Sequence, residues 1–500
     1  MKRSHLIRTI QHLADTKPSF MLSEIARSPG TPATPEGLYR EILPHLPALG
    51  LQARKIGNDY EVEKIPAGHP YRLSPAEEQR LTAFLAGRTF PTALERAVEA
   101  YIGKKTGKNW TDQVTLERLR RAIVAQKADY WKEPGRRRLS YTKGYAVLGY
   151  LAYHFPVYFM QTEYLLAMLA GDGLLKPSMT ILDVGSGPGV VPLAIAAFWS
   201  RLDNARAAVW SVERSEEQVE AFMFLRDAVV PRGEHVSVKP PVRADIHEVL
   251  PHAIPEKVDL IVFSNVLNEL PDSTMDTRAG IVERMADRLA PDGSILIIEP
   301  ADEENSTCMR TLTAELYQRG LFVHAPCTFI RGTTCTAPRC WSFATAPAIR
   351  PTRLMEALAS CGESYRYVNT DIKYSYAILR KDGVRMTGYR VAPGAKFIRF
   401  SKLHLAVGKR ANVAAVKMSS ELGDAKNHLF KVCDGTAKTP VYAVLPAFHM
   451  TPENEALRTA PYGTVLEMKG VLVRYNREHD AYNLLVSRNT EIQIPEAGNR

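Results

Sequence analysis

The stretch Thr180-Ile-Leu-Asp-Val-Gly-Ser-Gly-Pro-Gly-Val-Val-Pro-Leu-Ala-Ile195 decides the fold. Its β-branched and leucine residues predict a buried strand that ends near Asp183, and a small apolar helix follows the glycines. Gly185, Gly187 and Gly189 have no Cβ, so the backbone can turn sharply and a ligand can lie against it. The stretch therefore predicts a strand, a tight turn and a helix whose first amides are free to face a ligand.

The glycine spacing indicates the kind of ligand. A dinucleotide fingerprint has the spacing G-x-G-x-x-G, which seats a pyrophosphate. Here the spacing is G-x-G-x-G behind an aspartate, which resembles the first motif of class I S-adenosylmethionine-dependent methyltransferases. We expect Asp183 to accept hydrogen bonds from an ammonium or hydroxyl group, with Ser186 in the same cofactor-binding turn. A plain glycine-rich strand end is the alternative.

Further strand-like runs alternate with helix-like runs after this motif, as in an open parallel sheet. Each run ends in polar residues, and parallel strands present such ends at one edge, where ligands bind. The runs are 207–212, 236–239, 258–263 and 293–298. The sequence therefore predicts an α/β protein with a Rossmann-like class I methyltransferase core.

The polar ends of these runs are candidates for the rest of a cofactor site. Glu213 ends the second run, where an acid binds the ribose hydroxyls in Rossmann-like sheets. Asp245 and Ile246 are expected beside the adenine. Asn265 is a candidate for binding the cofactor and for orienting a methyl acceptor. An equally supported alternative is that Asn265 simply closes the end of the strand. No acid–base pair stands out, and methyl transfer to nitrogen can proceed by positioning alone.

The net charge and the hydropathy restrict the classes of partner that the protein can bind. The 500 residues carry 64 Lys and Arg against 54 Asp and Glu, a net charge of +10. This excess favours an anionic partner, nucleic acid first, although scattered surface lysines would give the same total. No apolar run reaches the ~18 residues of a membrane span. The N-terminus merges at once into an ordinary helical pattern, so we expect a cytoplasmic protein, with a mitochondrial one as the second choice.

The length suggests several domains. Residues 1–68 read as a winged-helix-like module, with helices followed by a hairpin that turns at 57–59. Residues 69–165 read as a helical basic region. Residues 166–350 form the methyltransferase-like domain with a cysteine cluster, and 351–500 read as a β-rich, OB-like region.

Basic and aromatic residues interleave between residues 104 and 143, a pattern that suits phosphates and splayed RNA bases. This region holds six lysines and six arginines, among them Arg136-Arg137-Arg138, together with Trp110, Tyr130, Trp131 and Tyr141. A solvated helical face is the alternative. Residues 1–68 and 397–500 are further candidates for RNA contact, the latter because OB-folds often bind single strands.

Three cysteines, Cys327, Cys335 and Cys340, lie within fourteen positions. Six cysteines in this length exclude a disulfide scaffold. Clustered thiolates suit zinc or an iron–sulfur cluster, and a fourth ligand would come from elsewhere. Buried apolar thiols are the alternative. The remaining cysteines are Cys308, Cys361 and Cys433.

The order of these motifs resembles the methyltransferase-like small-ribosomal-subunit assembly family, which has mitochondrial and prokaryotic members. The resemblance covers residues 140–440. The segments that carry it are 150–156, 182–189, 213–215, 264–270, 298–300, 325–327, 340–341 and 374–381.

This resemblance implies association with the small ribosomal subunit and a 4Fe-4S cluster. Cys327, Cys335 and Cys340 match the clustered cysteines of the family, and Cys433 matches the fourth. The chain departs from the family where Cys-Pro-His is usual and it has Cys327-Thr-Phe, and where a glycine is usual and it has Ala301. Zinc stays the alternative metal.

Two functions follow from this reading. The first is an S-adenosylmethionine-dependent RNA methyltransferase acting on small-subunit rRNA. The second is a non-catalytic assembly factor that binds S-adenosylmethionine and an iron–sulfur cluster structurally. Only turnover separates them, and the basic flanks and additional modules disfavour a small-molecule methyltransferase.

Overall fold

The computed structural model describes most of the chain, which divides into two compact units. The first unit is 1–125, 140–260 and 349–369, and the second is 126–139, 261–348 and 370–500. The residues described are 6, 9–10, 13, 17, 19–26, 34–43, 46, 51–64, 70–130, 144–231, 235–248, 251–270, 274–332, 335 and 339–495.

The N-terminal region contains a small antiparallel sheet of order β1-β3-β2. Its elements are β1 (Ser19–Met21), α2 (Leu22–Ala26), α3 (Pro35–Ile42), β2 (Leu51–Ile56) and β3 (Asp59–Lys64). The hairpin of β2 and β3 is the expected wing. Phe20 of β1 pairs with Val62 in the sheet and is buried in the small core. The region is winged-helix-like, as predicted.

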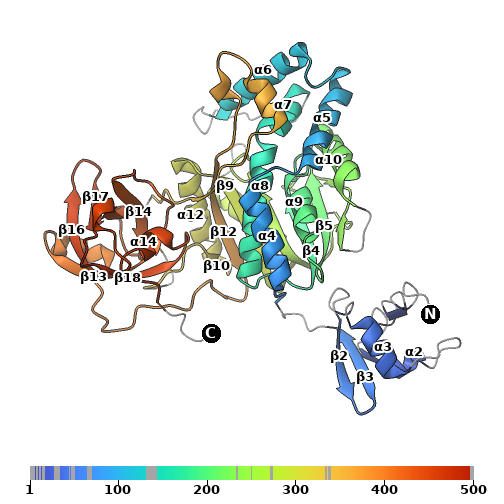
Figure 1. Ribbon diagram of the computed structural model, residues 1–500, viewed down its shortest axis with the longest axis horizontal. Coiled ribbons are helices and arrows are strands. Elements are labelled where there is room, and N and C mark those ends of the chain that lie inside the picture. Colours follow the sequence, from blue (N-terminus) through green and yellow to red (C-terminus); the bar gives the residue numbers. More distant parts are fainter. Residues whose placement is uncertain are drawn as a thin grey trace. The chain divides into compact units, whose positions relative to one another are not determined.

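A helical region follows in the first unit (Figure 1). Its helices are α4 (Pro75–Gly87), α5 (Thr92–Thr106), α6 (Gln113–Tyr130), α7 (Tyr145–Tyr153), α8 (Phe155–Gly171) and, from later in the chain, α13 (Arg353–Ala359). Ser74 and Glu77 form a capping box that starts α4. Arg353 of α13 donates to Glu99 of α5 at 2.6 Å, which fastens this distant segment to the helical region.

The central element is a large mixed sheet with the strand path β10-β12-β9-β8-β4-β5-β6. Strands β4, β5 and β6 are parallel, whereas β12 runs antiparallel to both β9 and β10. The elements are β4 (Ser178–Val184), α9 (Val190–Trp199), β5 (Arg206–Glu213), α10 (Glu216–Val229), β6 (Val236–Val238), β7 (Val242–Arg243), β8 (Val258–Ser264), α11 (Met275–Ala286), β9 (Leu289–Pro300), α12 (Glu303–Gln318), β10 (Phe322–Ala325), β11 (Ala344–Ala346) and β12 (Ile372–Arg380).

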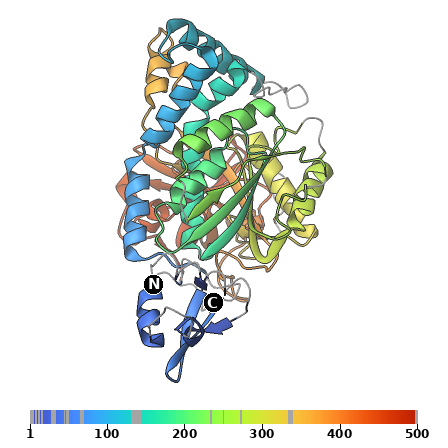
Figure 2. The same cartoon turned by 90° about the vertical axis from the view of Figure 1, so that its right-hand side faces the viewer.

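Strand β12 lies beyond the expected domain limit at residue 350, yet it belongs to the central sheet. Its residues are almost all buried, and Tyr376 pairs with Ile298 while Leu379 pairs with Ile295. An apolar strand of this kind needs cover on both faces, and only a sheet interior provides it. Figure 2 shows the green strands β4 and β5 with helices of the same colour beside them.

The C-terminal region is a small barrel within the second unit. Strands β13, β14, β15, β17 and β16 pair in that order, and β16 pairs back onto β13, which closes the barrel. The β15–β17 pairing is parallel and the others are antiparallel. This is the OB-like region that the sequence predicts. Its elements are η3 (Ser364–Arg366), η4 (Phe400–Ala406), β13 (Arg410–Lys417), β14 (Asn427–Cys433), β15 (Val441–Pro446), η5 (Ala447–His449), α14 (Ala456–Thr459), β16 (Val465–Asn476), β17 (Ala481–Leu485) and β18 (Glu491–Gln493), of which η3 precedes the barrel in the first unit.

Among the described helices, none combines the length and the apolar character that a membrane crossing requires.

Candidate functional site

The glycine turn sits between β4 and α9 and is attached to the end of β5. The N–H groups of Gly185 and Ser186 both donate to the carbonyl oxygen of Val212, at 2.9 and 3.1 Å. Gly187 and Gly189 have positive φ angles of 52° and 89°, a conformation that strains residues with a Cβ. A Cβ on Gly189 would lie under 3.0 Å from ring atoms of Phe222, whereas one on Gly187 would meet nothing within 4 Å. Gly189 is thus required by packing, and Gly187 leaves open space for a ligand.

Asp183 lies at the end of β4, directly before this turn, and is only 1% exposed. Its Oδ2 has no hydrogen-bond partner among the described residues, nor does Oγ of Ser186. Burial raises the pKa of the Asp183 carboxyl well above its usual range, and the charge of Glu213 raises it further. A buried acceptor without a partner costs free energy. A ligand that donates a hydrogen bond or carries positive charge would remove this cost.

Glu213, at the end of β5, is directly connected to the glycine turn. Its Oε2 accepts from the N–H of Gly187 at 2.9 Å, and its Oε1 accepts from the N–H of Ser215 at 2.8 Å. Burial raises the pKa of the Glu213 carboxyl, while these N–H groups lower it. The structure therefore brings together two predicted acids and the predicted turn, at the carboxyl ends of neighbouring strands.

The predicted adenine-binding residues follow β7. Asp245 is half-buried; its Oδ1 accepts from the N–H of His247 at 2.9 Å, and its Oδ2 lies 3.6 Å from Arg214. Ile246 is 8% exposed and belongs to the core. The contacts of Asp245 are thus with its own loop and with Arg214, and its role toward a cofactor stays a prediction.

Asn265 lies in the second unit, one residue beyond β8. Its backbone has a φ of +53°, a left-handed conformation that asparagine tolerates better than most residues. Its N–H donates to the carbonyl oxygen of Ile298 at 2.9 Å, and its Nδ2 donates to Ser264 at 3.3 Å. These contacts close the strand end. An acceptor-binding role for Asn265 stays a prediction.

The four predicted metal-binding cysteines come from separate segments of the second unit and affect one another. A hydrogen bond with Cys335 and burial together raise the pKa of the Cys433 thiol well above its usual range, and Cys340 adds to the effect. Burial raises the pKa of Cys327 to about 11, with Cys340 and Cys335 contributing. Arg310 opposes that rise. The thiols therefore lie close enough together to interact electrostatically.

No three His, Cys, Asp or Glu side chains within the described residues are arranged as ligands of a single metal ion. All six cysteines are free thiols.

Two cations, the buried Lys431 and the partly buried Arg310, lie near these thiols and were not predicted from the sequence. Arg310 of α12 donates to the carbonyl oxygen of Tyr376 at 2.9 Å and to Oγ of Ser375 at 3.2 Å. Burial would lower the pKa of Arg310, but the charge of Cys327 and further neighbours raises it overall. Lys431 of β14 donates to the carbonyl oxygen of Trp341 at 2.8 Å. Both cations can offset negative thiolates, and no sequence motif marks either residue.

A buried ion pair joins the segments that carry the cysteines. Arg331 lies between Cys327 and Cys335, Asp434 follows Cys433, and Nε of Arg331 is 3.1 Å from Oδ2 of Asp434. The two side chains are 6% and 0% exposed. The Nε–H does not point at the oxygen well enough for a hydrogen bond, so the pair is held by charge. Their wide separation in sequence hid this pair from motif analysis.

Many side chains in the described part of the basic region have protein partners. Arg120 is buried and donates to the carbonyl oxygens of Leu358 and Ala357 at 2.9 and 3.2 Å. Lys105 pairs with Glu220 at 2.7 Å. Arg136, Arg137 and Arg138, together with Trp131 and Tyr141, lie outside the described residues. RNA binding by 104–143 therefore stays a prediction.

The strand order, with an antiparallel strand inserted before the last one, and the turn that joins Asp183 to Glu213 define a protein with a class I methyltransferase fold. The family model described as mitochondrial small ribosomal subunit Rsm22 matches residues 144–435, more than half of the chain. The chain therefore belongs to this family. A second model, a C-terminal domain of unknown function named DUF8157, matches residues 401–495, which contain the barrel.

Solved structures of methyltransferases share parts of this fold at low identity. A methyltransferase from Clostridium acetobutylicum is 13% identical, covers 31% of this chain and 53% of its own, and has a TM-score of 0.23. A protein described as such a methyltransferase from Methanococcus maripaludis is 20% identical, with coverages of 33% and 64% and a TM-score of 0.22. The chain thus spans less than two thirds of either structure.

Magnesium protoporphyrin IX methyltransferase from Synechocystis, solved with bound S-adenosylmethionine, is 13% identical to this chain. It covers 54% of this chain and 92% of its own, with a TM-score of 0.28. No curated protein matches the chain.

Replacing Gly189 with alanine should destabilise the protein. The new Cβ meets the ring of Phe222 and occupies a left-handed conformation, which alone costs about 1–2 kcal/mol. Urea unfolding should show a lower midpoint than for Gly187→Ala, where only the conformational cost applies. Equal midpoints for the two variants would contradict the packing role of Gly189.

Replacing Asp434 with asparagine should destabilise the second unit, because Arg331 is left buried without its counter-charge. Breaking a buried pair in this way costs roughly 3–5 kcal/mol. Chemical denaturation followed by tryptophan fluorescence measures the loss. Asp371→Asn, at a side chain 65% exposed, is the control and should change stability little. A similar effect of both substitutions would show that the pair contributes nothing.

Proposed function

We propose that this protein is an S-adenosylmethionine-dependent methyltransferase that acts on the RNA of the small ribosomal subunit. The observation that carries the proposal is the buried carboxylate of Asp183, whose Oδ2 has no hydrogen-bond partner among the described residues, beside the open space at Gly187. A cationic ligand placed against a bare glycine backbone would satisfy both features at once.

The residues fit S-adenosylmethionine. Asp183 would bind its ammonium group, whose positive charge would lower the raised pKa of that carboxyl. Glu213 would bind the ribose hydroxyls, with Asp245 and Ile246 beside the adenine and Ser186 in the turn. When bound, the cofactor supplies a methyl group on a sulfonium that is already a good leaving group. The protein's own contribution is then to fix the geometry of the reactants.

The ribosomal substrate is inferred from the family and from charge. The family's description names the mitochondrial small ribosomal subunit, and the chain carries a net charge of +10. Basic side chains gain affinity for phosphates by releasing counterions. A mitochondrial location agrees with the family's description, whereas the cytoplasmic location that we first expect has no such support.

We also propose that Cys327, Cys335, Cys340 and Cys433 hold a 4Fe-4S cluster. Thiolates are the ligands of such clusters, and each binds a separate iron, so the thiols need not converge on one point. The proposal is supported by thiols that lie close enough together to interact electrostatically. Arg310 and Lys431 would offset the negative charge. A bound cluster would join the 327–340 segment to β14, next to the Arg331–Asp434 pair.

The second candidate is an assembly factor without turnover. One observation favours this candidate. The hydrogen bonds of Asn265 to Ile298 and Ser264 close the end of a strand, and neither of them indicates that Asn265 binds a methyl acceptor. Cofactor and cluster would then stabilise the fold alone, as bound ligands do by mass action.

Methyl transfer distinguishes the two candidates. Anaerobically purified protein is incubated with radiolabelled S-adenosylmethionine and small subunits from a strain that lacks the protein. We expect label in the rRNA with the native protein and none with Asp183→Ala, because that variant lacks the partner of the cofactor ammonium. Asp227→Ala, at a side chain 64% exposed, is the matched control and should transfer label normally.

The Asp183→Ala variant should remain folded, because it removes a buried carboxylate whose Oδ2 has no hydrogen-bond partner among the described residues. Calorimetry on the same samples reports cofactor binding. Cofactor binding without methyl transfer would favour the assembly factor over the methyltransferase. Transfer by Asp183→Ala at the native rate would refute the proposed cofactor site.

Loss of one cysteine tests the cluster. We expect Cys335→Ser to abolish the brown absorption of the anaerobic protein and to lower its melting temperature, because metal binding contributes folding free energy. Cys361→Ser, at an exposed cysteine outside the group, should keep the colour. Colourless native protein with one equivalent of zinc would overturn the iron–sulfur assignment in favour of zinc.

A further inference from the structure

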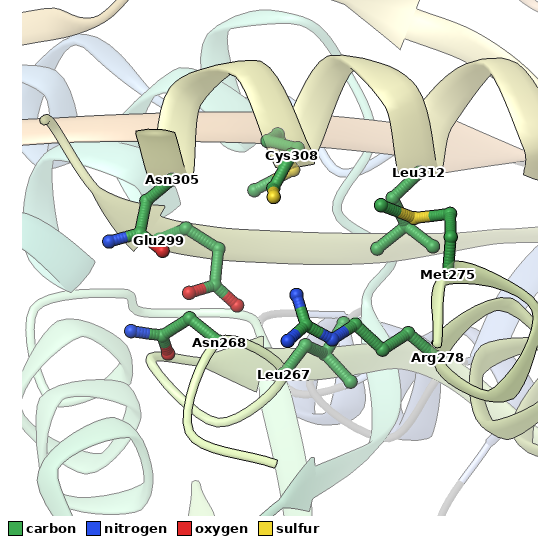
Figure 3. A pocket seen from close by; sticks show the side chains of 9 residues that line it. Leu267, Asn268, Met275, Arg278, Glu299, Asn305, Cys308 and Leu312 are labelled. Atoms are coloured by element: carbon green, nitrogen blue, oxygen red, sulfur yellow. The ribbon is translucent and has the colours of Figure 1, made fainter. Parts of the chain in front are cut away.

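The polar pocket at the ends of β8 and β9 is too small for a ligand. The side chains of Glu299 and Arg278 turn toward one another there (Figure 3), and the space between them and Asn268 holds about one water molecule. An ordered water therefore accounts for the unpaired atoms of these three side chains. The pocket belongs to the packed interior and is no site for a larger molecule.

The segment that leads into the C-terminal barrel carries positive charge without any acid. Residues 383–420 contain eight lysines and arginines and no aspartate or glutamate. The whole chain has 64 basic residues against 54 acidic ones, so this segment departs strongly from the average of the chain. Charge of one sign that gathers on a surface attracts a partner of the opposite sign.

The 3₁₀ helix η4 in this segment turns one side into the barrel and the other to solvent. Phe400, Leu403 and Ala406 are buried in the barrel core. Because a 3₁₀ helix has three residues per turn, these positions share one side of it. Lys402 and Leu405 lie on the remaining surface and are exposed. The charged residues of η4 therefore face the solvent.

Hydrogen bonds hold two further segments beside η4. Near its start, the N–H of Ser401 donates to Oγ1 of Thr436 at 3.2 Å, which attaches the turn between β14 and β15. After its end, the N–H of Val473 in β16 donates to the carbonyl oxygen of Lys409 at 3.0 Å. The exposed cations of these joined segments include Arg399, Lys402, Lys409, Lys438 and Arg474.

These five cations, which we name the η4 surface, have no acidic partners. None of them forms an ion pair within the part of the chain that the structure describes. Residues 399–409, 434–438 and 473–475 contain a single acid, Asp434, which is buried and already paired with Arg331. The η4 surface therefore presents positive charge that its own segments do not neutralise.

An exposed aromatic ring lies next to these cations. Tyr475 follows Arg474 in β16 and is 41% exposed. Its ring centre lies 5.2 Å from that of Tyr482 on β17, and its hydroxyl donates to Asp480 in the hairpin turn. These contacts fix the orientation of the ring. In single-strand-binding proteins, bases stack on such rings while cations follow the phosphates.

The face that OB-folds commonly use for nucleic acids is partly covered in this protein. That face lies on the second and third strands of the barrel, here β14 and β15. Lys431 of β14 is only 9% exposed, and its Nζ donates to the carbonyl oxygen of Trp341 at 2.8 Å. The η4 surface offers a different side of the barrel.

We propose that the η4 surface binds single-stranded RNA, with phosphates at the cations and a base stacked on Tyr475. A duplex hides the faces of its bases within the stack, whereas a single strand exposes them. A membrane fits less well, because peripheral binding uses an amphipathic helix with a broad apolar face. The seven-residue η4 instead has its apolar side in the barrel core. The proposal rests on the proposed function only in taking the RNA to be ribosomal.

RNA binding is measured on the full-length protein without S-adenosylmethionine. A fluorescent, unstructured RNA of about 16 nucleotides, the upper site size of an OB-fold, is titrated at several salt concentrations and followed by anisotropy. The triple variant Lys402→Gln, Lys409→Gln, Arg474→Gln should bind roughly tenfold more weakly at ~0.1 M salt. The slope of log affinity against log salt should fall by about 0.7 for each phosphate contact that is lost.

Tyr475→Leu tests the stacked base separately. It should weaken RNA binding by roughly fivefold or more and leave the salt slope unchanged, because stacking involves no phosphate. Native affinity of this variant would overturn the stacking part of the proposal.

A matched control removes the same kinds of charge from exposed cations that are paired with acids. It is the triple variant Lys373→Gln, Arg458→Gln, Lys469→Gln, which should keep native affinity and slope. Equal losses in both triple variants would show that only net charge matters and overturn the proposal. Melting temperatures equal to that of the native protein check that the variants fold.

Vesicles of phosphatidylcholine and phosphatidylserine test a membrane as the partner. Vesicle binding that the first triple variant abolishes, while its RNA binding stays native, would overturn the proposal. A failure of methyl transfer remains distinguishable, because RNA binding is measured without cofactor. Native protein that binds RNA through the η4 surface and transfers no methyl group would refute the methyltransferase and support this inference.

Discussion

The parallel pairing of β4 with β5 is the interaction on which the candidate cofactor site depends. Its register places Asp183 opposite Ser211 and Val184 opposite Val212, so both strands end at the same level. The turn that follows β4 can then donate two N–H groups to Val212 and a third to Glu213. A shift by one residue would turn Asp183 to the other face of the sheet. The acid pair therefore depends on backbone hydrogen bonds within the sheet.

A different kind of constraint organises the cysteine region. Its thiols come from two segments, residues 327–340 and β14, that lie about a hundred positions apart, so bringing them together costs loop-closure entropy. The buried ion pair of Arg331 and Asp434 helps to hold the same two segments together. A buried pair of this kind is weak evidence for net stability, but the loss of one partner is costly. Its clearest role is to fix which segments meet.

Asp183 and Glu299 share one feature, a carboxylate oxygen that has no hydrogen-bond partner among the described residues. Asp183 and Glu299 are both buried carboxylates at strand ends, and burial raises the pKa of both. Glu163 is also buried, but it has Arg201 as a partner at 2.9 Å and belongs to the packed core. Burial raises the pKa of Glu163 as well, to about 8, so the difference lies only in whether the carboxylate has a partner within the fold.

The sequence by itself determined the core strands, the glycine turn, the acids at its edge and the OB-like character of the C-terminus. These are local patterns of apolar runs and glycines, which sequence spacing records directly. Only the tertiary structure decided that β12 enters the central sheet from beyond residue 350, that Arg120 is a structural residue, and that Arg310 and the Arg331–Asp434 pair surround the thiols. The unsatisfied atoms of the Glu299 pocket likewise became visible only there. Each of these features depends on contacts between distant segments, and long-range pairing leaves no period in the sequence.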